Sequence, residues 1–171
     1  AKVESAGNAS VYGQPDQLSV ASGIAAMTSR SDGAGYWIAT SEGTVLKFGA
    51  ASHFGDMSAV TLNKPVVGMA STKTGNGYWL VASDGGIFSF GDAVFYGSTG
   101  ALALNSPIVD MTASTTGAGY WLVAADGGVF SFGDAVFYGS TGNLVLNRPI
   151  VGMLSTKSSL GYWLLADDGG I

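Results

Sequence analysis

The sequence predicts an all-β fold, a β-propeller built from four 42-residue repeats of four strands each, with the two ends of the chain sharing one blade. Three observations predict it. One dipeptide recurs at a fixed spacing, each repeating unit has the composition of short strands joined by tight turns, and the two ends of the chain are complementary parts of one unit. The 171 residues have the length of one domain.

The repeat is visible in a Gly-Tyr-Trp motif and in the methionines that precede it, both spaced by 42 residues. Residues 78–119 and 120–161 share about 29 identities when one segment is laid over the other. The members of the series are Tyr36-Trp37, Tyr78-Trp79, Tyr120-Trp121 and Tyr162-Trp163, with Met27, Met69, Met111 and Met153. The chain is therefore an array of one duplicated unit.

Each unit is expected to contain four short strands, because Val, Ile, Phe, Tyr and Trp are grouped between Gly and Asp. In the third unit the expected strands begin at residue 107 and then cover 120–124, 129–132 and 136–138. A loop at 114–119, a tight Asp-Gly-Gly turn at 126–128 and a second turn at 133–134 separate them. No apolar run with helical periodicity is long enough for a helix.

Four strands in a unit of this length are typical of a propeller blade. The second strand, Tyr-Trp-Leu-Val-Ala, is apolar on both faces, which suits a blade packed between two neighbours. A β-solenoid is the alternative, although its coils are usually shorter and carry fewer aromatic residues.

The ends of the chain suggest how the ring closes. Residues 3–13 align with 129–139, the third and fourth strands of a unit, and the chain stops at Ile171, where its own third strand begins. The repeats are placed at 23–64, 65–106, 107–148 and 149–171, the last completed by 1–22 within a single domain, 1–171. Strands from both ends would then share one blade and remove the open sheet edges. A ring assembled from two chains and a window of a longer array are the alternatives.

Composition excludes several classes of protein. Only 11% of the residues are charged and 47% are hydrophobic, the opposite of a disordered chain. The net charge of −5 argues against a nucleic-acid partner, and no apolar stretch is long enough to span a membrane. Without cysteine there is no disulfide and no thiol nucleophile. The dinucleotide and P-loop fingerprints are absent, so no cofactor is expected.

Four segments of the third repeat resemble a repeat of secreted and cell-surface bacterial proteins, largely actinobacterial. They are residues 119–124 (GYWLVA), 126–130 (DGGVF), 132–135 (FGDA) and 137–140 (FYGS). The resemblance covers essentially the whole chain and implies a propeller module with a binding or scaffold role outside the cytoplasm. The first repeat departs most from the motif, at Glu42, Ala50 and His53.

Few residues suggest chemistry. His53 is the single histidine, no Gly-x-Ser-x-Gly nucleophile motif occurs, and His53 replaces a phenylalanine of the other repeats, so a structural role is expected. The recurring Asp84, Asp126 and Asp168 are interpreted as turn residues, since Asp favours turns by bonding to nearby backbone. Calcium binding is the alternative, but the loops lack the acidic density of a calcium site, and no metal site is assigned.

The candidate ligand-binding residues are Asp110, Tyr96, Tyr138, Asp92 and Asp134. Asp110 stands where the other repeats have Gly68, Gly152 and Ala26, in the strand expected to line the central channel. One member of each pair Phe95-Tyr96 and Phe137-Tyr138 is expected to be exposed on the outer strand, near the turn carboxylates Asp92 and Asp134. The four tryptophans are expected to form the core between blades, with sugar stacking as the alternative.

These features favour a non-catalytic binding or assembly module, secreted or on the cell surface, that contacts glycan or protein through loops and blade rims. High repeat identity and little variety of catalytic residues favour it over a propeller-type hydrolase with its active site at the channel mouth. A structural subunit of a surface fibre or sheath is a further alternative. The chain is expected to be a monomer, or to form a ring or fibre by strand exchange.

Overall fold

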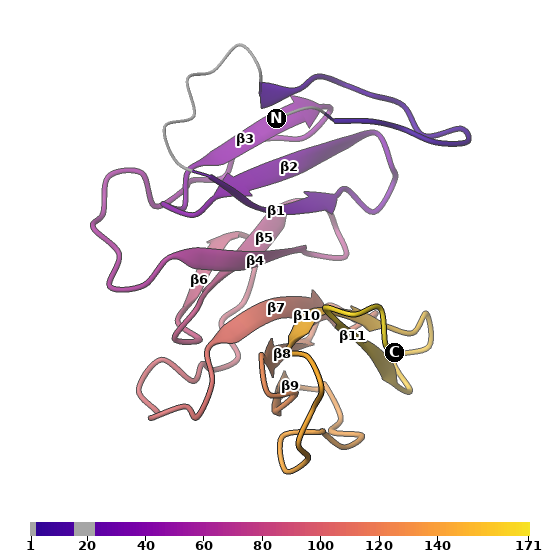
Figure 1. Ribbon diagram of the computed structural model, residues 1–171. Helices are drawn as coiled ribbons and strands as arrows, with labels where there is room; N and C mark the ends of the chain where they lie inside the picture. The colour runs from indigo at the N-terminus through magenta and orange to yellow at the C-terminus, as the bar shows by residue number, and fades with distance from the viewer. Residues whose placement is uncertain (1–2, 16–22) are drawn as a thin grey trace.

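The computed structural model describes residues 3–15 and 23–171, and these form an all-β structure of eleven strands in four small antiparallel sheets (Figure 1). The four sheets coincide with the four sequence repeats, which are called repeats 1 to 4 below. Repeat 1 contains β1 (Ile24–Ser29), β2 (Gly35–Thr40) and β3 (Val45–Gly49). Repeat 2 contains β4 (Val66–Ser71), β5 (Gly77–Ala82) and β6 (Ile87–Gly91). Repeat 3 contains β7 (Ile108–Ala113), β8 (Gly119–Ala124) and β9 (Val129–Gly133), and repeat 4 contains β10 (Ile150–Ser155) and β11 (Tyr162–Ala166).

The sheets repeat the same register, as expected for copies of one sequence. In repeat 3, Met111 lies opposite Leu122 and Trp121 lies opposite Ser131. The first strand of every repeat carries an irregularity near its start, between Ile108 and Asp110 in β7, and at the corresponding positions of β1, β4 and β10. A bulge bends and twists a strand. The first strand of each repeat, called the inner strand below, is therefore bent in the same way.

The predicted core residues lie in the middle strands. Every residue of β2, β5 and β8 is buried, and Trp37, Trp79 and Trp121 are 0% exposed. Each of these indoles also donates its Nε1 hydrogen to a backbone carbonyl at 2.8 Å, so the one polar atom of the buried side chain has a hydrogen-bond partner. The expectation that the four tryptophans form the core is confirmed for these three and is wrong for Trp163, which is 52% exposed.

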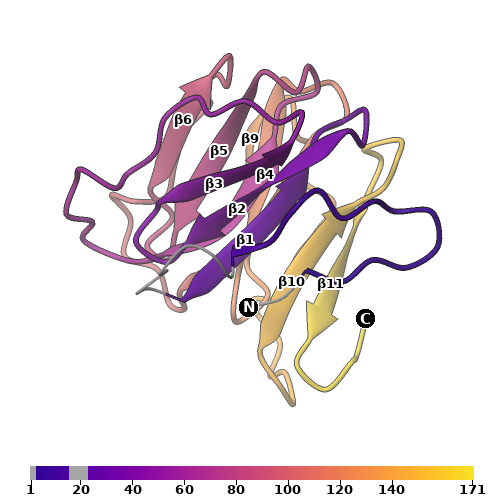
Figure 2. The same cartoon turned by 90° about the horizontal axis from the view of Figure 1, so that it is seen from above.

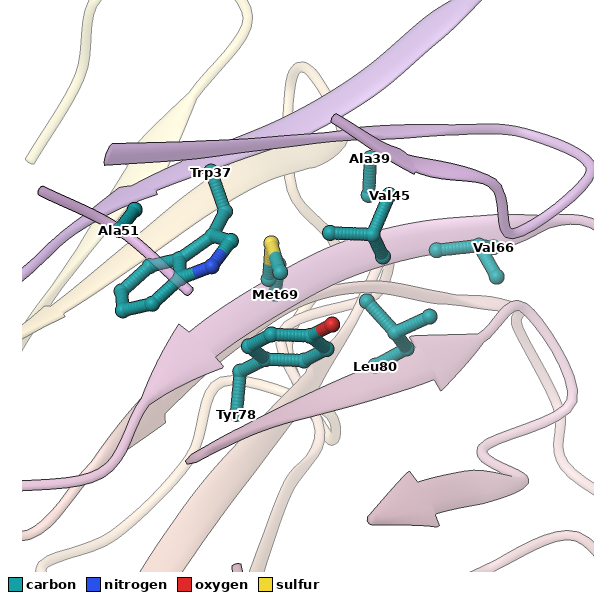
Figure 3. Packing of buried hydrophobic residues seen from close by; sticks show 8 residues of the cluster. All are labelled: Trp37, Ala39, Val45, Ala51, Val66, Met69, Tyr78 and Leu80. Atoms are coloured by element: carbon teal, nitrogen blue, oxygen red, sulfur yellow. The ribbon is translucent and has the colours of Figure 1, made fainter. Parts of the chain in front are cut away.

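The sheets stack on one another around a common centre, in the order of the chain (Figures 1 and 2). The inner strand β1 packs against β4, β4 against β7, and β7 against β10. Apolar clusters fill the spaces between sheets. In the first of them, Trp37, Ala39, Val45 and Ala51 of repeat 1 meet Val66, Met69, Tyr78 and Leu80 of repeat 2 (Figure 3). This is the packing of propeller blades, and the predicted β-propeller fold of four repeats is confirmed.

The Asp-Gly-Gly turns are also found where they were expected. Gly85, Gly127 and Gly169 have φ between +80° and +84°, a conformation that side chains with a Cβ disfavour. The carboxylates of Asp84, Asp126 and Asp168 accept a hydrogen bond from the backbone N–H two residues later, at 2.9, 2.9 and 3.1 Å. These aspartates therefore do what Asp does in tight turns.

The prediction of a fourth strand is wrong. Residues 134–139, and their equivalents 50–55 and 92–97, pair with no sheet and instead run over the next repeat. Side-chain hydrogen bonds replace the ladder there: the hydroxyl of Tyr120 donates to the carbonyl of Gly97 at 2.6 Å and accepts from the N–H of Tyr96 at 3.1 Å. The same tyrosine arrangement recurs at Tyr78 and Tyr162. We call each such stretch the outer segment of its repeat.

The prediction that the two ends share one blade is also wrong for the described residues. Residues 3–13 belong to no sheet and lie beside repeat 1, where the hydroxyl of Tyr36 donates to the carbonyl of Gly13, while the C-terminal strands lie at the other end of the array (Figure 1). Among the described strands, β1 and β10 lack the contact that joins neighbouring inner strands. Residues 1–2 and 16–22, part of the predicted completion of repeat 4, lie outside the described residues. The arrangement is an open arc.

Candidate functional site

The inner strands surround a cavity of about 440 Å³ at the centre of the arc. All four repeats contribute to its lining, including Met27, Ser71, Asp110 and Leu154. Hydroxyl groups join neighbouring repeats across it. The Ser71 hydroxyl donates to the carbonyl of Ser29 at 2.8 Å, and the Ser155 hydroxyl donates to that of Ala113 at 3.2 Å. These carbonyls belong to the free edges of the inner strands, so serines of the next repeat satisfy them.

Asp110 is the carboxylate of this cavity, as the sequence predicted. Its Oδ1 accepts the N–H of Met111 at 2.8 Å and its Oδ2 accepts the N–H of Met153 at 2.9 Å, so the side chain links β7 to β10. Gly152 lies next to it, and a Cβ built there would be in ordinary van der Waals contact with Oδ2 at 3.8 Å. Burial raises the pKa of Asp110 above its usual value, and the two backbone hydrogen bonds oppose that rise only in part. Both carboxylate oxygens thus already have partners within the protein.

Asp92 and Asp134 join loops within their own repeats. Asp134 accepts from the hydroxyls of Ser114 at 2.8 Å and Thr116 at 2.5 Å, which ties the turn after β9 to the loop between β7 and β8. Asp92 does the same with Thr72 and Thr74. The structure therefore places these two candidates directly after β6 and β9, hydrogen-bonded to Thr72 and Ser114, which line the central cavity with Asp110.

Repeat 1 joins the same two loops through Arg30, which donates to the carbonyl of Ala50 at 3.5 Å. Ala50 replaces the aspartate, and the corresponding loop carries Arg30 and Asp32, whose side chains pair at 2.8 Å. Arg30 also reaches the carbonyl of Gly75 in repeat 2, at 3.4 Å. The hydrogen bonds from Arg30 and from the N–H of Ala34 lower the pKa of Asp32 to about 2. In repeat 1, Arg30 and Asp32 thus take the place of the aspartate and the hydroxyl residues found in repeats 2 and 3.

The tyrosines Tyr96 and Tyr138 point toward the next repeat. Tyr96 packs against Trp79 and Tyr120, with ring centroids 6.5 and 5.8 Å apart, and its hydroxyl donates to the carbonyl of Gly117 at 3.2 Å. Tyr138 makes the equivalent hydrogen bond to Ser159 at 3.1 Å, and packs against Tyr162. Their role in the structure is to hold the outer segments on the next repeat.

The exposed partners of these tyrosines are the residues before them. Phe95 and Phe137 are 58% and 55% exposed, and the preceding Val94 and Val136 are exposed to the same degree. We call these four residues the apolar rim. Their backbone is fixed from inside, because the indoles of Trp79 and Trp121 donate to the carbonyls of Val94 and Val136. Only Phe95 is exposed in the pair Phe95-Tyr96, as expected, whereas both members of the pair Phe137-Tyr138 are exposed, since Tyr138 is 43% exposed.

Two further grooves lie at equivalent places, one beside the Glu-Gly-Thr turn of repeat 1 and one beside the Asp-Gly-Gly turn of repeat 2. One, of about 480 Å³, contains Glu42, Leu62 and Asn63 in its wall, and the other, of about 270 Å³, contains the corresponding Asp84, Leu104 and Asn105. Each lies between the turn and the loop that leads to the next inner strand. The only sequence signal for these grooves is the Asn-x-Pro pattern at 63–65, 105–107 and 147–149, which precedes β4, β7 and β10.

His53 lies on the outer segment of repeat 1, half exposed, with Nε2 at 3.4 Å from Oδ2 of Asp56. Burial raises the pKa of Asp56, but hydrogen bonds from Ser58, Val45 and His53 outweigh it and leave that pKa below its usual value. No serine or other nucleophile is hydrogen-bonded to His53 in the described residues. Across residues 3–15 and 23–171, no three His, Cys, Asp or Glu side chains gather as metal ligands would.

A search for helices able to cross a membrane finds none among the residues that the structure describes.

Comparisons with known proteins support the class of fold and nothing finer. No family model matches the chain, and no curated protein matches it. A crystal structure of a structural-genomics protein of unknown function from Bacteroides thetaiotaomicron is similar in fold, with a TM-score of 0.55 and 14% sequence identity. The match covers 82% of this chain and 41% of that one, so the chain spans less than half the length of its structural neighbour.

Proposed function

We propose that this chain is a non-catalytic binding module that acts outside the cytoplasm and contacts a glycan or a protein through its apolar rim. The observation that carries the proposal is the exposure of Phe95 and Phe137 at equivalent places of adjacent repeats, on backbone that buried tryptophans fix. Rigid exposed aromatic side chains bind partners at a low cost in conformational entropy.

The chemistry of the rim favours a protein over a glycan as the partner. Each phenylalanine is flanked by an exposed valine, and the nearby carboxylates of Asp92 and Asp134 are engaged with loop hydroxyls. A protein surface with apolar side chains complements such a rim, whereas sugar binding also needs free hydrogen-bonding groups. The location outside the cytoplasm rests on the resemblance of the repeat to those of secreted and cell-surface proteins.

The binding proposal is tested with the double variant F95S/F137S and the matched control L102S/L144S. Leu102 and Leu144 are as exposed as the phenylalanines and lie in the same two repeats, but away from the rim. Each protein is applied to arrays of bacterial cell-surface proteins and of cell-wall glycans. We expect the unmodified chain and the control to bind a protein of the array, and F95S/F137S to lose at least about tenfold in affinity at unchanged melting temperature.

The outcomes separate the alternatives. Binding to glycans alone would leave the rim as the proposed binding surface but make a glycan its partner. Equal binding by F95S/F137S would overturn the proposal. The hydrolase alternative is tested on the same samples with generic glycosidase and esterase substrates. Turnover that D110N abolishes would place a catalytic centre in the central cavity and contradict a non-catalytic role.

A further inference from the structure

The last repeat presents an apolar face that its equivalents bury. Trp163 is 52% exposed, although the three tryptophans at the same register are 0% exposed. Leu154 and Leu165, its neighbours on the same side, are 63% and 43% exposed. With Ile171 they line a groove of about 370 Å³ whose exposed surface is almost wholly apolar. In repeats 1 to 3 this side is covered by the following repeat. We call it the leading face.

The first repeat presents the opposite face of the same interface. Ile24 and Met27 are 42% and 51% exposed, whereas at the same register Val66, Ile108 and Ile150, and Met69, Met111 and Met153, are all buried. Between repeats 1 and 2, Met69 lies beside Trp37, and Val66 lies beside Val45 at the other end of the same cluster, as Figure 3 shows. Ile24 and Met27 therefore form a trailing face whose natural complement is a tryptophan such as Trp163.

Residues 3–13 complete the match. They lie on repeat 1 as an outer segment lies on the repeat that follows it: Tyr36 donates to the carbonyl of Gly13, as Tyr78 donates to Gly55 and Tyr120 to Gly97. Repeat 1 thus already holds the outer segment of a preceding repeat. Repeat 4, in turn, has its first two strands, β10 and β11, in place, and residues 167–171 form a turn and no strand.

We propose that the leading face of one chain docks on the trailing face of a second copy of the same chain. The three interfaces within the chain are the template, so the residues that meet are specified. Trp163 packs beside Met27 as Trp37 lies beside Met69, and Ile24 packs beside Ile171 as Val66 lies beside Val45. The indole of Trp163 donates to the carbonyl of Ser10, as Trp37 donates to that of Ser52. Residues 4–6 continue beside β11 the strand that Ile171 begins, with Ser5 opposite Trp163 as Ser131 is opposite Trp121.

A second copy is the occupant that the observations favour, because it carries the complementary face in the same molecule. The two faces differ, so the contact is heterologous and joins chains head to tail, leaving each pair with one further leading and one further trailing face to join. The apolar rim is formed by other residues, so this association is separate from the proposed binding function.

The association is measured by sedimentation velocity over a series of concentrations, with W163E and M27E as the test variants. Both residues are half exposed in the single chain, so their replacement leaves the fold intact. We expect the unmodified chain to reach at least twice its 17.3 kDa mass as concentration rises, and each variant to stay at 17.3 kDa. F95E is the matched control, because Phe95 is as exposed but lies on neither face, and it should associate like the unmodified chain.

A mixture of the two variants tests the head-to-tail geometry. W163E retains its trailing face and M27E retains its leading face, so the mixture should form a pair through one intact interface while the second is blocked by two carboxylates. A mixture that stays at 17.3 kDa overturns the geometry. An unmodified chain that stays at 17.3 kDa throughout overturns the proposal and assigns the exposed faces to another occupant, and association that W163E does not weaken overturns it equally.

Discussion

At the scale of single residues, the four tryptophans show how one side chain takes two roles according to its place in the array. Trp121 is wholly buried between repeats 3 and 4, whereas Trp163, at the same register, is 52% exposed because none of the described residues covers its outer side. The sequence predicted one role for all four, because spacing shows equivalence of position and does not show what lies on the far side.

Replacing Trp121 by alanine should cost about 3–5 kcal/mol of unfolding free energy, since it opens a large cavity and removes an indole hydrogen bond. W163A is the matched control and should cost about 1 kcal/mol or less in the dilute chain, because the side chain is half exposed. Urea unfolding of both variants checks this. Equal losses would contradict the difference in burial.

Asp110 should make stability fall as pH rises. Burial raises its pKa in the folded state above the unfolded value, so between the two values the folded state binds more protons. The advantage of the native chain over D110N should therefore shrink with rising pH, from about pH 3.9 upward through the folded-state pKa. Urea unfolding of both proteins at several pH values measures it.

Asp32 should contribute to stability with the opposite dependence on pH, and it therefore serves as a control. Its pKa is lowered to about 2, so its contribution is present above the unfolded value and is lost as pH falls toward 2. An advantage over D110N that grows with pH would mean that Asp110 titrates like Asp32, and would contradict its burial.

Replacement of Asp134 tests whether its carboxylate has a structural role or binds a ligand. D134A removes the acceptor of Ser114 and Thr116 and should cost about 1 kcal/mol, a modest value because the carboxylate is exposed. The double variant D134A/S114A should cost less than the sum of the single variants, since both remove the same hydrogen bond. Additive effects, or no loss of stability in D134A, would return Asp134 to the candidate ligands.

At the scale of elements, the turns and the first three strands follow from local chemistry, and sequence predicts them well. Expected strands at 120–124 and 129–132 are found as β8 and β9 within a residue, and Asp126 and Gly127 act as turn chemistry requires. The outer segments were misassigned because Val136-Phe137-Tyr138 has strand composition. Its hydrogen-bonding partner is a tyrosine hydroxyl of the next repeat, which no local pattern reveals.

The turn itself gives a prediction in which strain and steric clash are separated. Gly127→Val should cost more than about 1 kcal/mol, because φ is +80° and a Cβ there would lie 1.8 Å from the hydroxyl oxygen of Thr141. Gly169 has the same conformation with no atom within 4 Å of its Cβ position. Gly169→Val should therefore lower the unfolding free energy by less than Gly127→Val, and the difference is the cost of the steric clash. Thermal unfolding of both variants measures the difference. Equal costs would show that the contact with Thr141 adds nothing to the effect of Gly127→Val.

At the scale of the whole molecule, the sequence predicted the repeat number and the propeller class, and it misjudged closure. The match between residues 3–13 and 129–139 is real, since these residues lie on repeat 1 as an outer segment should. Closure within four repeats depends on the angle between neighbouring sheets. That angle is set by the packing of side chains such as Met69 and Trp37 at each interface, and periodicity carries no information on it.

The candidate site shows the same limit. Asp110 was found from its singularity among equivalent positions, and the structure places it in the central cavity as expected. The rim was found only to within one residue, because alternation within an unpaired segment depends on contacts with Tyr120 and Trp121 of the array.

The central claim is an open arc of four repeats, in which three tryptophans are sealed between repeats and the fourth is not. It is tested most directly by acrylamide quenching of four variants that each keep one tryptophan and carry phenylalanine at the other three, at a dilution where the mass is 17.3 kDa. We expect Trp37, Trp79 and Trp121 to be protected and Trp163 to be quenched as an exposed indole. Equal protection of all four would indicate a ring closed within one chain, and equal quenching would contradict the stacking of the repeats.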